Sequence, residues 1–138
     1  MTSRDERDAL EHFEGRYAVP DSAVAAAIER HVIGAVWGAN GYTTLDQADE
    51  LARRLALGPG RRVLDVGTGR GWPGLYFAAR YSCVVVGTDM PFDALSAASR
   101  RARAERAEHL FRAVAAAGAH QPFRPKSFDA IVHTDVLC

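Results

Sequence analysis

Residues 62–74 read RVLDVGTGRGWPG, and this stretch decides the fold of the chain. It opens with a short apolar run that contains one acid, Asp65, as is typical of a buried parallel strand. Three glycines follow at alternate positions: Gly67, Gly69 and Gly71. Glycine allows positive φ angles and lets another molecule approach the backbone closely. Since Pro73 suits the first turn of a helix, the stretch predicts a strand, a glycine turn and a helix N-terminus, which form a site for a polar ligand group.

A second β-branched run, residues 83–88, leads directly into another acid, Asp89. A carboxylate at the carboxyl end of the second strand of such a unit can accept two hydrogen bonds from a ribose diol. That task needs an anionic acceptor of fixed geometry, which a strand end provides. The alternative interpretation is that Asp89 only caps the helix that follows Pro91.

The acid Asp65 followed by G-x-G-x-G at residues 67–71 resembles the first motif of class I S-adenosylmethionine-dependent methyltransferases. The approach to the fourth strand, residues 122–132, also resembles this family. The resemblance covers roughly residues 40–138 and implies a Rossmann-like parallel sheet that binds S-adenosyl-L-methionine and transfers its methyl group to an acceptor, which we expect to be a small molecule. It also implies that Asp65 orients the glycine loop or reaches the cofactor's amino group through water.

The resemblance assigns further positions by their place in the motifs. Asp89 would hold the ribose hydroxyls, and Met90 would pack on the adenine. Many family members carry an acid after the third strand, whereas this chain offers Ala119 or His120 there. The expected cofactor-binding residues are Tyr42, Asp65, Gly67, Thr68, Gly69, Gly71, Asp89, Met90, Ala119, His120 and His133.

Two other functions remain open at this point. Residues 69–74 fit the G-x-G-x-x-G of dinucleotide-binding folds, so an NAD(P)-binding oxidoreductase-like domain is one alternative. The position of Gly67, directly after the strand, disfavours it. A non-catalytic binding module is the other. His133 and Asp135 lie at the end of the fourth strand, where an acceptor would meet the methyl group, but the sequence assigns no catalytic residue.

Periodicity predicts the element order. We expect strands near residues 62–66, 83–89, 111–115 and 128–133, and helices near 23–36, 45–57, 74–80 and 91–110. This order predicts an α/β fold with a parallel sheet preceded by N-terminal helices. Residues 1–57 form the expected helical segment, in which the loop at 40–44 is either a plain connection or a lid with Tyr42 as its contact. Residues 58–138 form the expected cofactor-binding core.

Two further sequence patterns predict which helix faces are buried or exposed. Apolar side chains recur at helical spacing near the start of the chain and predict one buried face, with His31 as a satisfied core or boundary histidine. The members of this stripe are Val24, Ala27, Ile28, His31, Val32 and Val36. An arginine run at residues 100–106 reads either as a phosphate-binding strip or as a solvated helix face, and the interleaved Glu105 favours the second.

Composition limits the setting and the partners. The chain has 138 residues and equal numbers of basic and acidic side chains, 17 of each, so its net charge favours neither nucleic acid nor an anionic membrane. Its two cysteines, Cys83 and Cys138, form no disulfide or metal pattern. With no signal peptide or membrane-spanning run, a cytoplasmic protein is expected. Because the family's sheet has seven strands and this sequence ends at the fourth, we expect an incomplete core, marginal stability and self-association through the open edge of residues 128–132.

Overall fold

The computed structural model of the chain describes residues 4–17 and 22–136. The elements, in chain order, are α1 (Arg4–Tyr17), α2 (Ala23–Ile33), α3 (Leu45–Arg54), β1 (Arg62–Val66), α4 (Gly74–Tyr81), β2 (Val84–Asp89), α5 (Phe92–Ala104), β3 (Phe111–Ala115) and β4 (Ala130–Val132). Cys138 lies outside the described residues.

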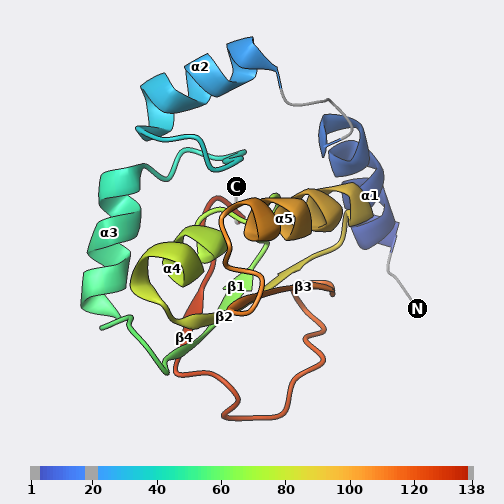
Figure 1. Cartoon of the computed structure of the whole chain (residues 1–138). Coiled ribbons are helices and arrows are strands. Elements are labelled where there is room, and N and C mark those ends of the chain that lie inside the picture. Colours follow the sequence, from blue (N-terminus) through green and yellow to red (C-terminus); the bar gives the residue numbers. More distant parts are fainter. Residues whose placement is uncertain (1–3, 18–21, 137–138) are drawn as a thin grey trace.

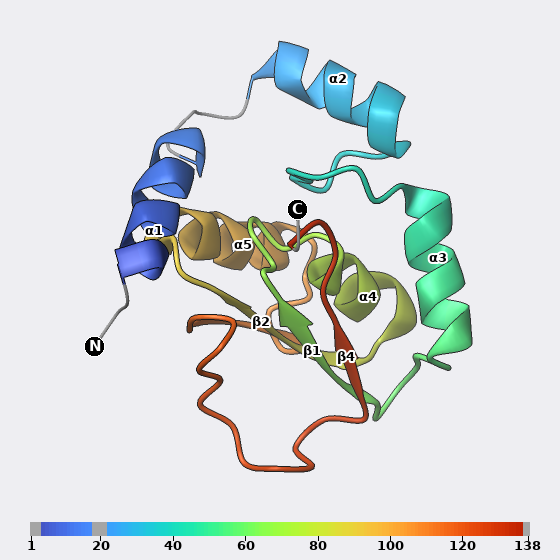
Figure 2. The ribbon, with the colours of Figure 1, turned by 180° about the vertical axis from the view of Figure 1, so that it is seen from behind.

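The four described strands form one parallel sheet in the order β3-β2-β1-β4. Val66 at the end of β1 lies opposite Thr88 of β2, and Thr88 lies opposite Val114 of β3. Helices α4 and α5 cover one face of the sheet (Figures 1 and 2). Parallel strands end at the same edge, so the segments that follow β1, β2 and β4 are brought together there. The predicted α/β fold with a Rossmann-like parallel sheet is confirmed.

The core lies between the sheet and its helices. Val63 of β1, Val85 of β2 and Phe77 of α4 are completely buried there. The same apolar cluster includes Trp37 and Ala48 from the N-terminal segment. Residues on both sides of position 57 therefore share one core, in which the N-terminal segment packs against the strands and helices that follow.

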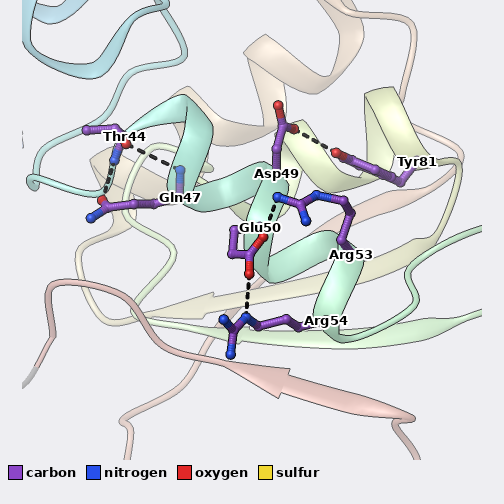
Figure 3. Close-up of polar contacts among 7 residues, drawn as sticks. All are labelled: Thr44, Gln47, Asp49, Glu50, Arg53, Arg54 and Tyr81. Carbon is purple, nitrogen blue, oxygen red and sulfur yellow. Dashed lines mark hydrogen bonds and ion pairs between the residues drawn. The ribbon is translucent and has the colours of Figure 1, made fainter.

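Helix α3 begins with a capping box, as the spacing of Thr44 and Gln47 in the sequence indicates. The Thr44 hydroxyl accepts a hydrogen bond from the Gln47 backbone N–H, and the Gln47 side chain accepts one from the Thr44 N–H (Figure 3). One turn later, Asp49 binds α4: its Oδ1 accepts hydrogen bonds from the hydroxyls of Tyr76 at 2.5 Å and Tyr81 at 2.6 Å. These two hydrogen bonds hold the pKa of Asp49 below its usual value.

The prediction that α2 buries its apolar face is wrong. Val24, Ile28 and Val32 are 69%, 60% and 46% exposed, and His31 is exposed as well, so it is not a core histidine. Helix α2 stands apart from the sheet and its helices (Figures 1 and 2). Its last residue, Ile33, is the one that reaches the core. Helical spacing shows that apolar residues share a face, but it does not show that an element covers that face.

Several element boundaries differ from expectation. Helices α2 and α3 end at Ile33 and Arg54, before the expected residues 36 and 57. Helix α5 ends at Ala104, well before residue 110, because the chain takes a left-handed conformation at Arg106, where φ is +56°. Strand β4 is shorter than expected, and Ile131 and Val132 point to opposite faces of the sheet, being 62% and 5% exposed. In the part of the chain that the structure describes, no helix combines the length and apolarity that crossing a membrane requires.

We expect Asp49→Ala to lower the free energy of unfolding by about 1–2 kcal/mol, because it leaves two tyrosine hydroxyls without their acceptor. Glu50→Ala is the matched control. Glu50 forms ion pairs with the exposed Arg53 and Arg54 (Figure 3). Such surface pairs contribute little to stability. Urea unfolding of both variants tests the expectation, and equal losses in the two would contradict it.

Candidate functional site

The glycine loop connects β1 to α4 and is built on positive φ angles. Gly67, Gly69 and Gly71 have φ values of +74°, +54° and +107°, which side chains rarely allow. The backbone N–H groups of Gly67 and Thr68 both donate to the Thr88 carbonyl, at 2.7 and 2.9 Å. The loop is therefore anchored to the end of β2, and its backbone lies at the carboxyl edge of the sheet.

Asp65 holds both ends of this loop from beneath. Its carboxylate is 1% exposed, and Oδ2 accepts hydrogen bonds from the Thr68 hydroxyl at 2.7 Å and the Gly74 N–H at 3.0 Å. A Cβ on Gly74 would lie 2.5 Å from that oxygen, so only glycine fits there. The other oxygen, Oδ1, is buried and has no hydrogen-bond partner among the described residues. Burial, with a smaller contribution from the charge of Asp89, raises the pKa of Asp65 to about 7.

Asp89 reaches the loop from the end of β2. Its Oδ2 accepts a hydrogen bond from the Gly69 N–H and its Oδ1 accepts one from the Met90 N–H, both at 2.8 Å. Burial raises the pKa of Asp89, and the two hydrogen bonds oppose this rise. Two carboxylates at the ends of neighbouring strands thus contact the same glycine loop.

A cavity of about 60 Å³ opens at the loop. Its walls come from four parts of the chain: Phe13 of α1; Gly38, Asn40 and Gly41; residues 67–70 and Trp72; and Thr134 with Asp135. Small-molecule sites usually measure roughly 300–1,000 Å³, so this cavity is narrow. The segment after β4 narrows it, because Val136 lies against Gly67 so closely that a Cβ on that glycine would clash.

Thr43 joins the N-terminal segment to both sides of this cavity. Its carbonyl accepts a hydrogen bond from the Trp72 indole N–H at 3.0 Å. Its backbone N–H and hydroxyl donate to Asp135 Oδ2, at 3.1 and 2.8 Å. One residue therefore ties residues 40–44 to the glycine loop and to the segment after β4.

The structure brings together only part of the predicted site. Asp65, Asp89 and the half-buried Met90 gather at the glycine loop through the contacts described above. The other four have exposed side chains: Tyr42, which lines the larger cavity described below, and Ala119, His120 and His133. None of these four lines the glycine-loop cavity.

Sequence reasoning missed several residues of the cavity wall. Trp72 lines the cavity and donates a hydrogen bond to the Thr43 carbonyl, 29 positions away in the sequence. Asp135, which the sequence places near the acceptor, accepts hydrogen bonds from Thr43, 92 positions away. No local sequence pattern predicts such contacts. In the sequence, Gly38 is interpreted only as part of a helix break, although it lines the cavity. Gly41 also lines the cavity and belongs to the loop at residues 40–44, for which a lid is one of the two interpretations.

A larger cavity, about 660 Å³, adjoins the first and is bordered by α2. Gly38, Asn40, Gly41 and Arg70 line both cavities. Elsewhere, Cys83 is a buried free thiol whose pKa burial raises to about 11. Among the described residues there is no cluster of three or more His, Cys, Asp or Glu side chains that could hold a metal ion.

The raised pKa of Asp65 predicts a pH-dependent stability. An unfolded aspartate titrates near pH 3.9, so between about pH 4 and pH 7 the folded chain binds a proton that the unfolded chain has lost. The free energy of unfolding should therefore fall as the pH rises through this range. Between about pH 5 and pH 8 we expect a loss of about 1–3 kcal/mol that Asp65→Asn does not show. Urea unfolding at both pH values checks this, with Asp93→Asn as an exposed control, and equal pH dependence in Asp65→Asn and the unmodified chain would contradict it.

Comparison with known proteins agrees with this architecture. The profile of a family described as "Methyltransferase domain" matches residues 63–138. Phosphoethanolamine N-methyltransferase 1 of Arabidopsis thaliana is 32% identical over 93 residues, covering 67% of this chain and 18% of that protein. Methyltransferase GfsG of Streptomyces halstedii is 34% identical over 83 residues, covering 60% of this chain and 30% of that protein.

A solved S-adenosylmethionine-dependent methyltransferase from Thiobacillus denitrificans, in complex with S-adenosyl-L-homocysteine, has the same fold. It matches with a TM-score of 0.63 and 20% identity, over 85% of this chain and 45% of that chain. The match to this chain spans less than a third of either curated relative. The family profile covers more than half of this chain. The chain therefore belongs to the class I S-adenosylmethionine-dependent methyltransferases, a family whose cofactor is S-adenosyl-L-methionine.

Proposed function

We propose that this chain binds S-adenosyl-L-methionine at the carboxyl ends of β1 and β2 and takes part in methyl transfer to a small-molecule acceptor. The observation that carries the proposal is the glycine loop held by Asp65 and Asp89. The buried Asp65 Oδ1, which has no partner among the described residues, fits a ligand that brings a hydrogen-bond donor or a positive charge.

The carboxylates of Asp65 and Asp89 can each accept further hydrogen bonds from a bound cofactor. An ionised carboxylate offers about four acceptor positions, and Asp89 uses two of them for Gly69 and Met90. Asp89 is therefore proposed to hold the ribose hydroxyls, with Met90 packing beside the adenine. Ala119 and His120, in the exposed segment after β3, are proposed to border the adenine from the other side.

The cofactor supplies an activated methyl group on a sulfonium sulfur, so the chain's main tasks are to bind, orient and exclude water. The glycine backbone lets the ligand approach closely, and the two carboxylates fix that backbone. His133 lies at the end of β4, beside Thr134 and Asp135 of the cavity wall. We propose that His133 lies near the acceptor, and we assign it no role in proton transfer.

The narrow cavity supports the lid function proposed for residues 1–57. The volume of about 60 Å³ is too small for a nucleoside ligand. Entry of the cofactor thus requires residues 40–44 and 134–136 to separate from the glycine loop. The contacts that would open are the hydrogen bond from the Trp72 indole N–H to the Thr43 carbonyl and the packing of Val136 against Gly67. Tyr42, which is 82% exposed, would be the lid side chain free to turn onto a ligand.

A small acceptor is supported by two facts. The Arabidopsis relative is named for phosphoethanolamine, a small molecule. The cavity of about 660 Å³ beside the glycine loop has the volume of a small-molecule site.

We expect two copies of the chain to associate through the outer edge of β4. Among the described strands β4 pairs only with β1, and Ile131 at this edge is 62% exposed. An open strand edge with an apolar side chain is a template for pairing. Sedimentation should show concentration-dependent association that Ile131→Lys reduces, whereas Val84→Lys, which replaces an exposed valine on the inner strand β2, should reduce it less. A monomer at all concentrations would contradict the expectation.

Titration calorimetry tests which cofactor the chain binds. We expect the chain to bind S-adenosyl-L-homocysteine, and NAD far more weakly. Asp89→Asn should weaken this binding roughly ten- to hundredfold, because hydrogen bonds to a charged group contribute about 1.5–3 kcal/mol. Asp93→Asn, an exposed acid in the first turn of α5, is the matched control and should bind normally. Binding of NAD without binding of S-adenosyl-L-homocysteine would overturn the proposal, and normal binding by Asp89→Asn would remove the role assigned to Asp89.

A further inference from the structure

The cavity of about 660 Å³ has an apolar wall that α2 and the segment after it form. Helix α2 contributes Ile28, Val32 and Ile33, and the following segment contributes Val36 and Ala39. Polar side chains complete the lining: Ser22, Glu29, Asn40, Tyr42, Arg70 and Arg101. An apolar wall with a small number of polar groups is the usual composition of a small-molecule site.

The apolar stripe of α2 is divided between this cavity and a second hollow on the same helix. Val32 lines the larger cavity, Val24 and Ala27 line the second hollow, and Ile28 borders both. None of the residues that line the second hollow lines the glycine-loop cavity. The larger cavity, in contrast, shares Gly38 with it and so adjoins the proposed cofactor site.

Helix α2 is held in place although most of its apolar stripe is exposed. Its last residue, Ile33, is 3% exposed and belongs to the core, as does Trp37 in the segment that follows. Glu29 Oε1 accepts hydrogen bonds from the backbone N–H groups of Trp37 and Ala39, at 2.6 and 2.8 Å. These bonds hold the segment where it runs back under α2 (Figures 1 and 2). The apolar wall is therefore formed before any ligand enters.

The exposure of this wall favours an apolar occupant. Ile28 and Val32 are 60% and 46% exposed, so much of their apolar surface contacts water. Removal of apolar surface from water is the main favourable contribution to association of this kind. An alkyl or aromatic group in the cavity would bury these side chains, whereas a fully polar ligand would gain nothing from them.

We propose that this cavity binds the apolar part of the methyl acceptor, and that the acceptor is a small molecule whose alkyl or aromatic body packs against Ile28, Val32 and Val36. The inference rests on the proposed function, because it names the chemical class of that function's acceptor. Since Gly38 and Gly41 line both cavities, the reactive end of the acceptor lies toward the glycine loop. Cofactor and acceptor then occupy the chain at the same time.

An uncharged fluorescent probe tests the chemistry of the cavity. Phenylnaphthylamine, whose emission rises in apolar surroundings, should bind the 138-residue chain, and butanol, hexanol and octanol should displace it. Each added methylene should increase the affinity of the alcohol about fourfold, the effect of about 0.8 kcal/mol for each buried CH₂. Alcohols that displace the probe equally well, or a probe that does not bind, would overturn the inference.

Two valines of α2 form a matched pair that locates the probe. Val32→Asp should weaken probe binding about tenfold, because it places a charge in the apolar wall. Val24→Asp should leave binding unchanged, because Val24 is 69% exposed and lines only the second hollow. Thermal melting checks that each variant folds, and Val32→Ala with Val24→Ala gives the same comparison without a new charge. Binding that depends on Val24 and not on Val32 would contradict the inference.

The role as acceptor site is tested with S-adenosyl-L-homocysteine. A saturating concentration of that ligand should leave the affinity for phenylnaphthylamine unchanged or raise it, because an acceptor has to bind beside the cofactor. Displacement of the probe would assign the larger cavity to the cofactor and overturn the inference, while the proposed function would stand. A chain that binds the probe through Val32 but does not bind S-adenosyl-L-homocysteine would overturn the proposed function, and the apolar site would stand.

Discussion

The contact of one buried carboxylate with both ends of the glycine loop organises this protein. Asp65 accepts hydrogen bonds from the Thr68 hydroxyl and the Gly74 N–H, and it does so at a position that is almost fully buried. A buried charge costs stability unless its partners are well placed. Here the partners are the turn of the loop and the first residue of α4, so the interaction that satisfies the acid also fixes the shape of the site.

Strand β2 also holds the glycine loop through hydrogen bonds. The N–H groups at Gly67 and Thr68 share the Thr88 carbonyl, and Gly69 donates to Asp89. Two acids at neighbouring strand ends repel each other, which contributes to the raised pKa of Asp65. A ligand with positive charge would relieve that repulsion. The repulsion between Asp65 and Asp89 is therefore a feature that binding of a cationic methyl donor would use.

Much of this arrangement could be predicted from the local sequence. Strand β3, the α3 capping box and the two acids at the ends of β1 and β2 follow from residue pattern, because each depends on neighbours a few positions apart. The exposure of the apolar face of α2 and the hydrogen bonds that Thr43 forms with Trp72 and Asp135 could not be predicted in this way. Both depend on which elements, far apart in the sequence, lie side by side in the fold. The half-buried Arg101 is a similar case: helical spacing placed it in a solvated run, whereas Gly38 covers it from another part of the chain.

The central claim is that the glycine loop and the two acids beneath it form the cofactor site. Backbone amide resonances of the ¹⁵N-labelled chain, followed during titration with S-adenosyl-L-homocysteine, test it at the residues concerned. The account predicts that the largest shifts occur at Thr68, Gly69 and Met90, whose amides or side chains contact Asp65 and Asp89. Shifts confined to α2 or to the outer face of the sheet, with these three amides unchanged, would contradict it.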